Sequence, residues 1–253
     1  MTERDELVHY SADRGVARIE LDSPHNRNAL SRQLCAELDA HLLTASEDSS
    51  VRAVELTHTG SVFCAGADLS EASSGPAITD VMVGLLRRIL DMPKPVVARL
   101  DGHVRAGGLG IVGAADVALG SHKVTFAFTE VRIGVAPAMI TLTTLGRMTE
   151  RAASRYLLTG ETFDAATAAE VGLITAAVDD LDGATAALFD ELRKCSPQGL
   201  AETKPLTTRT TREAFDDRSV ELAELSARLF ASDEAKEGMR AFLEKRSPSW
   251  VLS

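Results

Sequence analysis

Two short stretches of small residues indicate chemistry at a carbonyl group. The first is Phe63–Leu69, with the sequence FCAGADL, and the second is Arg105–Gly110, with the sequence RAGGLG. Glycine and alanine let a backbone N–H group approach a ligand closely, because they carry little or no side chain. Two such N–H groups aimed at one oxygen form an oxyanion hole, which stabilises the negative charge that develops on an activated carbonyl. Each stretch follows a strand-like run, so we expect both loops at one edge of a sheet.

Glu130 is the candidate for proton transfer. It lies in the apolar run Phe126–Val131, an unusual setting for a carboxylate. Burial raises the pKa of a carboxyl group toward the range that is useful for proton transfer at neutral pH. The alternative is a glutamate at a strand end that pairs with Arg132, and the residues alone leave both interpretations open.

A third pattern competes with the first two. Gly108–Gly113, with the sequence GLGIVG, matches the dinucleotide-binding fingerprint, and Glu130 lies at the distance of a ribose-binding acid. In a dinucleotide site the strand runs directly into the first glycine. Here residues 101–107 separate Gly108 from the predicted strand that ends at Leu100, which argues against a dinucleotide. The plainer alternative is that these glycines serve helix packing.

Composition excludes several classes of function. The chain has 253 residues and a net charge of −10, which argues against nucleic acid or an anionic membrane as the main partner. Its three cysteines form no CxxC motif and its six histidines form no HExxH motif, so we expect no disulfide framework and no metal site. The N-terminal segment lacks the apolar core of a signal peptide. We therefore expect a cytoplasmic protein.

Strand and helix patterns alternate through much of the chain, which predicts an α/β fold with a parallel sheet covered by helices. The predicted strands are Val16–Leu21, Val51–Thr57, Val96–Leu100, Asp116–Leu119 and Val124–Phe128. The predicted helices are one capped by Ser31 and those at Asp80–Leu90, Gly108–Ala115, Arg151–Leu158, Ala165–Val171 and Leu181–Lys194. We divide the chain into a core, residues 1–195, and a helical segment, residues 196–253. The apolar faces of that segment fit a subunit interface and packing on its own core equally well.

Several motifs occur in a characteristic order and spacing. They are Asn28–Leu30, Phe63–Leu69, Lys94–Ala98, Gly102–Asp116, Phe126–Pro137 and Glu244–Arg246. In this ordered set the chain resembles the enoyl-CoA hydratase/isomerase (crotonase) superfamily over nearly its whole length. The resemblance implies a spiral core of repeated ββα turns. It also implies that the C-terminal helices build homotrimers, often stacked into hexamers.

The resemblance assigns roles to individual residues. Ala67 and Gly108 match the two positions whose N–H groups polarise the thioester carbonyl. Lys245 matches a lysine that reaches the coenzyme A phosphates from a neighbouring subunit. The positions that match the backbone around the adenine are Ala65, Asp68 and Leu69. Coenzyme A enters as part of an acyl-CoA substrate, so no separate cofactor is expected.

One catalytic position departs from the family pattern. Glu130 matches the second catalytic glutamate of typical hydratases, whereas the first falls at Gly110. The loops around both positions look most like hydratases of the methylglutaconyl-CoA type, which act in branched-chain acyl-CoA breakdown. The resemblance therefore implies an enoyl-CoA hydratase that adds water to a 2-enoyl-CoA, and it leaves straight and branched acyl groups both open. The alternatives are a Δ3,Δ2-enoyl-CoA isomerase that uses Glu130 alone and an acyl-CoA-binding protein without activity.

The missing glutamate leaves the attacking water without an obvious holder. We consider His103, Arg105 and Thr129 as candidates for that role. We also expect that a side chain introduced at Gly110 would project toward the same pocket. The positions expected to line the acyl group are Met82, Leu85, Phe128, Met139 and Ile140.

Overall fold

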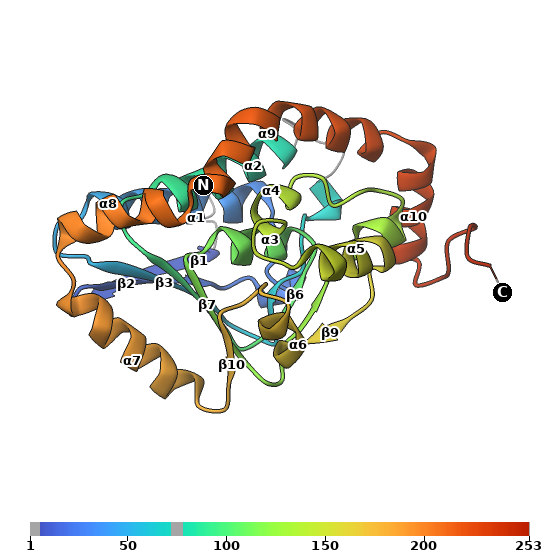
Figure 1. Cartoon of the computed structure of the whole chain (residues 1–253). Coiled ribbons are helices and arrows are strands. Elements are labelled where there is room, and N and C mark those ends of the chain that lie inside the picture. The colour runs from blue at the N-terminus through green and yellow to red at the C-terminus, as the bar shows by residue number, and fades with distance from the viewer. Residues whose placement is uncertain (1–5, 72–77, 253) are drawn as a thin grey trace, which may run out of the picture.

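A computed structural model describes residues 6–71 and 78–252, and in that part of the chain the strands form two sheets (Figure 1). The larger sheet, in spatial order, contains β1 (Val8–Asp13), β2 (Val16–Leu21), β3 (Ala53–His58), β5 (Val96–Leu100), β7 (Val117–Ser121) and β10 (Ala176–Val178). The smaller sheet contains β4 (Val62–Cys64), β6 (His103–Arg105), β8 (Thr125–Ala127) and β9 (Phe163–Asp164). Strand pairs are parallel except β1 with β2 and β8 with β9.

The chain follows a repeated path through these sheets. Strand β3 in the larger sheet leads to β4 in the smaller sheet and then to helix α2 (Ile78–Asp91). Strands β5 and β6 repeat this step before helix α3 (Gly107–Ala114), and β7 and β8 repeat it before the 3-10 helix η3 (Thr129–Ile133). Each turn thus adds one strand to each sheet. The expected spiral of ββα turns is present.

The local sequence explains where helix α1 begins and why helix α3 is buried. Helix α1 (Arg32–Glu47) begins after Ser31, whose side-chain oxygen accepts a hydrogen bond from the N–H of Leu34 at 3.2 Å. Helix α3 is small and apolar around its whole circumference, and every residue after its first is buried. A helix without a polar face must lie inside the molecule. The core therefore encloses α3 after its first residue, Gly107.

The last part of the described chain is helical. Its helices are α7 (Leu181–Lys194), α8 (Pro197–Thr207), α9 (Arg209–Phe230) and α10 (Asp233–Leu243). In Figure 1, α9 crosses over α2 and α10 descends beside α5 (Glu150–Thr159). Phe215 and Leu222 of α9 are buried within the same chain, so part of this segment packs on its own core. The division at residues 195 and 196 and the assembly into trimers stay predictions.

The predicted strands and helices are confirmed, with ends shifted by a few residues, and so is the parallel pairing of β2 with β3. The remaining named helices are α4 (Thr141–Thr144), α6 (Ala165–Glu170), η1 (Pro24–Asn26) and η2 (Leu69–Glu71). The sequence patterns missed β1 and the short strands β4, β6, β9 and β10. That omission makes our argument against a dinucleotide wrong, because β6 passes into α3 through a single residue, Ala106.

The glycines of α3 support the packing interpretation. A Cβ atom at Gly113 would lie 2.7 Å from the carbonyl oxygen of Thr143, and one at Gly108 would lie 2.8 Å from Cβ of Cys64. Both positions lack space for a side chain because neighbouring segments touch the helix there. Among the described helices, none combines the length and the apolar character that a membrane span requires. The described side chains also contain no group of three or more His, Cys, Asp or Glu placed to hold a metal ion.

Candidate active site

Three adjacent parallel strands of the smaller sheet end at the same edge, and each leads into a predicted site residue. Strand β4 ends at Cys64, three residues before Ala67. Strand β6 ends at Arg105, shortly before the start of α3, and β8 ends at Ala127, three residues before Glu130. The registers pair Cys64 with Val104 and Arg105 with Ala127. Ligands bind beyond the carboxyl ends of parallel strands in many α/β folds, and these loops meet at such an edge.

The first two loops touch through their backbones. A Cβ atom built on Gly66 would lie 3.3 Å from the backbone nitrogen of Gly107. Leu30 donates to the carbonyl of Gly66 and accepts from the N–H of Asp68, which leaves Ala67 between two fixed neighbours. Within the described residues no acceptor is recorded for the N–H groups of Ala67 or Gly107. Two free donors on touching loops are what an oxyanion hole requires.

Gly107, and not Gly108, is the residue of α3 that lines the cavity beside Ala67. Gly107 is the first residue of the helix, so its N–H group is one of those that the helix itself cannot satisfy. Ala106 before it has a φ of 46°, which an alanine rarely adopts. Gly108 is also free of a recorded acceptor in the described part, but its Cβ position faces Cys64 and Val104. The cavity geometry therefore favours the residue before the predicted one.

Glu130 lies at the cavity with an unusual electrostatic environment. It is 9% exposed, and its Oε2 atom has no hydrogen-bond partner among the described residues. Burial raises the pKa of Glu130 to about 7. Within the described residues Arg132 forms no ion pair with Glu130, and it instead donates to the carbonyl of Thr159 at 3.2 Å. A carboxyl group in this state exchanges protons readily near neutral pH.

Helix α10 holds the segment that carries Glu130. A Cβ atom at Gly238 would lie 2.4 Å from the backbone of Ile133, and one at Gly134 would lie 2.6 Å from the backbone of Glu234. Gly134 has a φ of 79°, so its lack of a side chain serves both the turn and the contact. The two backbones approach so closely only because glycine stands on each side. The sequence patterns gave no indication of this contact.

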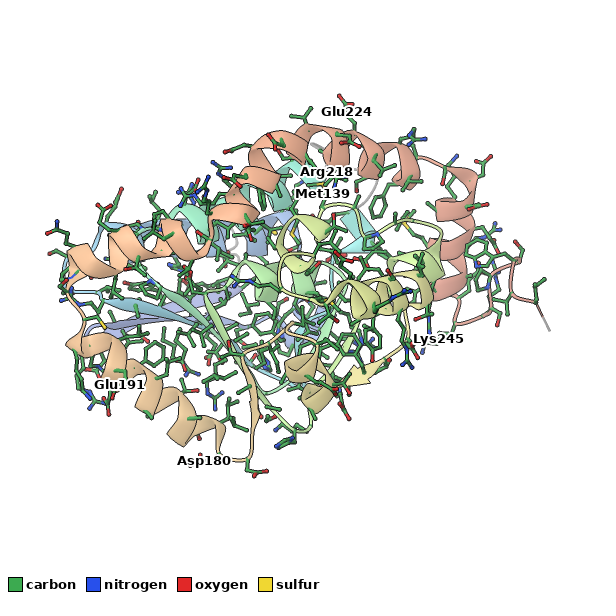
Figure 2. All side chains as sticks on the ribbon, in the orientation of Figure 1. Met139, Asp180, Glu191, Arg218, Glu224 and Lys245 are labelled. Atoms are coloured by element: carbon green, nitrogen blue, oxygen red, sulfur yellow. The ribbon has the colours of Figure 1, made fainter. Side chains whose placement is uncertain are left out.

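The cavity in front of Glu130 has a volume of about 1100 Å³. Of the five predicted acyl-lining residues, Met82, Met139 and Ile140 line it. Leu85 and Phe128 are instead buried in the core. Figure 2 shows Met139 below α9 and Lys245 near the end of α10, so the cavity lies between the spiral core and the last two helices.

The predicted coenzyme A residues lie around the same cavity. Ala65, Asp68, Leu69 and Lys245 all line it. Lys245 belongs to the same chain as the cavity, whereas the resemblance predicts a lysine that serves a neighbouring subunit. No second subunit is needed to bring Lys245 to this cavity. Its φ of 55° places the residue in a sharp turn just after α10.

The three candidates for holding a water differ in whether their side chains are already hydrogen-bonded to the protein. His103, Arg105 and Thr129 all line the cavity. The Arg105 guanidinium donates to the carbonyls of Val104 and Thr125 at 2.9 and 2.6 Å. The Nδ1 atom of His103 lies 3.0 Å from the hydroxyl of Thr125. No recorded contact among the described residues fixes the hydroxyl of Thr129.

Gly110 does not face the cavity directly. A Cβ atom there would lie 2.7 Å from Cγ2 of Ile140 and 3.4 Å from Cδ1 of Leu86. A side chain at this position would meet Ile140, which itself lines the cavity, so the expectation that it would project toward the pocket stays a prediction.

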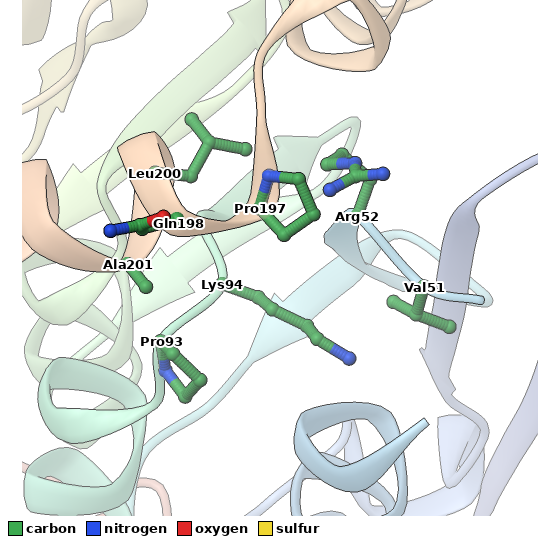
Figure 3. A pocket seen from close by; sticks show the side chains of 8 residues that line it. All are labelled: Val51, Arg52, Pro93, Lys94, Pro197, Gln198, Leu200 and Ala201. Atoms are coloured by element: carbon green, nitrogen blue, oxygen red, sulfur yellow. The ribbon is translucent and has the colours of Figure 1, made fainter. Parts of the chain in front are cut away.

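A second cavity, of about 250 Å³, lies between Lys94 and the start of α8 (Figure 3). The ammonium group of Lys94 points away from it into carbonyl oxygens of Ala45 and Asp48 at the end of α1. Apart from Arg52 and Gln198, the residues around it are apolar or already paired. The chemistry of the molecule therefore concentrates at the larger cavity.

Comparison with known proteins identifies the family. The family model described as "Enoyl-CoA hydratase/isomerase" matches residues 11–252. The chain belongs to the enoyl-CoA hydratase/isomerase family. The predicted superfamily and α/β crotonase fold are thereby confirmed, and the expectation of an enzyme of the hydratase kind is confirmed at the level of this family.

Individual relatives agree with this assignment. The crystal structure of an enoyl-CoA hydratase from Mycobacterium avium superposes with a TM-score of 0.92 at 53% identity, covering 98% of this chain and 100% of that one. Enoyl-CoA hydratase domain-containing protein 3, mitochondrial, from Danio rerio is 31% identical over 93% of this chain and 84% of its own length. Trans-2-decenoyl-[acyl-carrier-protein] isomerase from Streptococcus mutans is 28% identical over 96% of this chain and 97% of its own.

Proposed function

We propose that this member of the family is an enoyl-CoA hydratase that adds water to a 2-enoyl-CoA, with Glu130 as its acid–base residue. The observation that carries the proposal is a buried carboxyl group whose Oε2 atom has no partner in the described part and which lies at a cavity of about 1100 Å³. A pKa of about 7 means that both protonation states are populated near neutral pH. One carboxyl group is then able to accept a proton and to return one.

The reaction begins with polarisation of the thioester. The N–H groups of Ala67 and Gly107 bind the carbonyl oxygen and stabilise the enolate that forms when water adds to C3. The family resemblance assigns the second donor to Gly108. Replacing the backbone amide of Gly107 and that of Gly108 in turn by an ester decides between the two residues. Loss of the true donor is expected to reduce turnover by ~10²–10³-fold.

Glu130 completes the step without a second carboxylate. The water oxygen forms a bond to C3 while its proton passes to the ionised carboxylate of Glu130. The electron pair of the double bond moves into the enolate, and C2 then takes a proton from the Glu130 carboxyl. Atoms and charge balance, and Glu130 returns to its starting state.

The remainder of the substrate fits the other end of the cavity. We propose that Ala65, Asp68 and Leu69 hold the adenine through their backbone and that Lys245 binds a phosphate of coenzyme A. Lys245 is exposed, and Arg246, which follows it, also lines the cavity. Cationic side chains at the rim of a cavity attract a polyphosphate ligand. We also propose that the C-terminal helices build a homotrimer or hexamer, which light scattering on the purified protein measures.

A second candidate is a Δ3,Δ2-enoyl-CoA isomerase. Ile140 covers the position at which typical hydratases carry their first glutamate, so this wall of the cavity is hydrocarbon. A single carboxyl group suffices to move one proton between C4 and C2. One of the relatives named above is itself named an isomerase.

Turnover assays separate these functions. We expect hydration of a 2-enoyl-CoA, measured as loss of the conjugated thioester absorbance, to exceed conversion of a 3-enoyl-CoA. The opposite order assigns the chain to the isomerase reaction. Binding of both thioesters by calorimetry, without turnover of either, assigns it to acyl-CoA binding alone. Straight and branched 2-enoyl-CoA thioesters tested side by side decide whether the substrate is branched.

A further inference from the structure

Ile140 and Gly110 form a complementary pair on one wall of the cavity. Ile140 is 3% exposed and lines the cavity, while its Cγ2 atom lies 2.7 Å from the position that a Cβ atom at Gly110 would occupy. Contacts below 3.0 Å are essentially never seen for a real Cβ atom, so the glycine is required by the isoleucine.

The backbone of Ile140 is fixed relative to α3. The hydroxyl of Thr143 lies 2.9 Å from the carbonyl oxygen of Gly110 and 3.2 Å from that of Ile140. The hydroxyl of Thr144 donates to the same Ile140 carbonyl at 2.8 Å. Thr143 and Thr144 are completely buried. Because this backbone is held, any group added at Gly110 must displace the Ile140 side chain.

The wall continues from the proposed oxyanion hole. A Cβ atom at Gly107 would lie 3.0 Å from Cε of Met82, so the tip of Met82 stands beside the first residue of α3. Gly110 follows three residues later, about 4.5 Å further along the helix axis. An acyl chain that starts at a carbonyl near Gly107 and follows α3 therefore passes from Met82 to Ile140.

We infer that Ile140, seated on Gly110, determines which acyl groups the enzyme accepts. The inference rests on the proposed function, since it takes an acyl-CoA as the ligand. The side chain of Ile140 offers hydrocarbon and no hydrogen-bond partner to the part of the acyl chain a few atoms beyond the carbonyl. The site is thereby suited to unsubstituted hydrocarbon acyl groups, and the position of Ile140 limits their branching. A polar substituent on the acyl chain beyond C3 would lose its hydration there without replacement.

Gly110→Ala tests the pair. The added methyl group must push Ile140 toward the cavity, and one methyl in an apolar pocket changes discrimination by ~10-fold or more. We expect the ratio of Kd for 3-methylbutanoyl-CoA to Kd for butanoyl-CoA, both measured by calorimetry, to rise by that amount. Both ligands are saturated, so the measurement does not depend on turnover. Ile140→Ala should lower the ratio, and because Gly110→Ala acts through Ile140, the double variant Gly110→Ala/Ile140→Ala should stay close to the Ile140→Ala value.

Gly84→Ala is the matched control, because a Cβ atom there meets nothing within 4 Å. If Ile140→Ala fails to fold, Ile140→Val removes one methyl and is expected to lower the ratio in the same direction by less. A ratio that Gly110→Ala leaves at the Gly84→Ala value overturns the inference while the proposed function stands. A wild-type protein that binds neither thioester overturns both. Equal weakening of both ligands also overturns the inference, because it indicates a general distortion.

Discussion

Lys204 and Glu130 are both buried ionisable side chains, but the ammonium group of Lys204 has three partners whereas Oε2 of Glu130 has none in the described part of the chain. Lys204 is 4% exposed, and its ammonium group lies 2.7 Å from the carbonyl oxygen of Ile89 and 2.9 Å from that of Lys94. The third partner is the carboxylate of Asp116 at 2.8 Å. Glu130 is 9% exposed, and its Oε2 has no partner in the described part of the chain.

The difference separates a structural charge from a functional one. An ammonium group has three hydrogens, and all three of Lys204 are matched to acceptors. Its partners lie in α2, before β5 and after α3, so Lys204 ties these three segments together. Burial lowers the pKa of Lys204, which Asp116 opposes, whereas burial raises the pKa of Glu130 without a partner to offset it. An unsatisfied buried group costs stability, and such groups are kept where a ligand needs them.

The largest expected effect is the loss of activity in Glu130→Gln. The amide keeps the shape of the side chain but cannot exchange a proton as a carboxylate does. We expect turnover of a 2-enoyl-CoA to fall by ~10²–10⁴-fold while acyl-CoA affinity stays close to that of the wild type. Steady-state kinetics and calorimetry on the same preparation provide both values. Retention of near wild-type hydration would show that another group moves the proton.

The matching change at the other buried charge acts on stability. Lys204→Met removes one partner of a buried ion pair and leaves Asp116, within the described residues, with the N–H of Val96. Breaking such a pair costs about 3–5 kcal/mol, which urea unfolding measures. Lys194→Met is the control, because Lys194 pairs with Glu191 at an exposed site. An equally small loss for both variants would contradict the structural role of Lys204. Turnover per folded molecule should stay unchanged.

The pH dependence of stability distinguishes the two charges further. The pKa of Glu130 is about 7 in the folded protein against an ordinary value of 4.5 for a free glutamate side chain, so the folded state binds more protons between these values. Stability therefore falls as the pH rises through this window, by up to about 3 kcal/mol at about 1.4 kcal/mol per pKa unit. Glu130→Gln has no ionisable group at this position, so its stability does not fall in this way as the pH rises. We expect it to be more stable than the wild type at pH 8 and close to it at pH 4.5.

Urea unfolding of both proteins across this range measures the difference. Parallel curves for the wild type and Glu130→Gln would show that the carboxyl group titrates alike in the folded and unfolded states. That result would remove the electrostatic basis of the proposed mechanism even if Glu130→Gln were inactive.

Local sequence patterns were sufficient for much of the fold and part of the site. Ser31 and the leucines after it predicted α1, and the small residues around Ala67 and Gly107 marked the loops that meet. The short strands β4 and β6 span only three residues each, too few for a periodic signal. Asp116 and its partner Lys204 lie 88 positions apart in the sequence, and no local pattern connects them. The contact between Gly110 and Ile140 depends in the same way on how separate segments pack.

The smallest expected effect is a gain of stability in Gly84→Ala. Gly84 is an exposed residue within α2, and a glycine in the interior of a helix costs roughly 0.5–1 kcal/mol relative to alanine. Because a Cβ atom there touches nothing within 4 Å, we expect urea unfolding to show the whole of this gain in the free energy of unfolding.

Helix α2 carries Met82 at the cavity and accepts a hydrogen bond from Lys204 near its end, so it connects the two regions compared above. Turnover should be unchanged if α2 acts as a fixed support. A stabilised variant with slower turnover would instead show that movement of α2 contributes to the catalytic cycle.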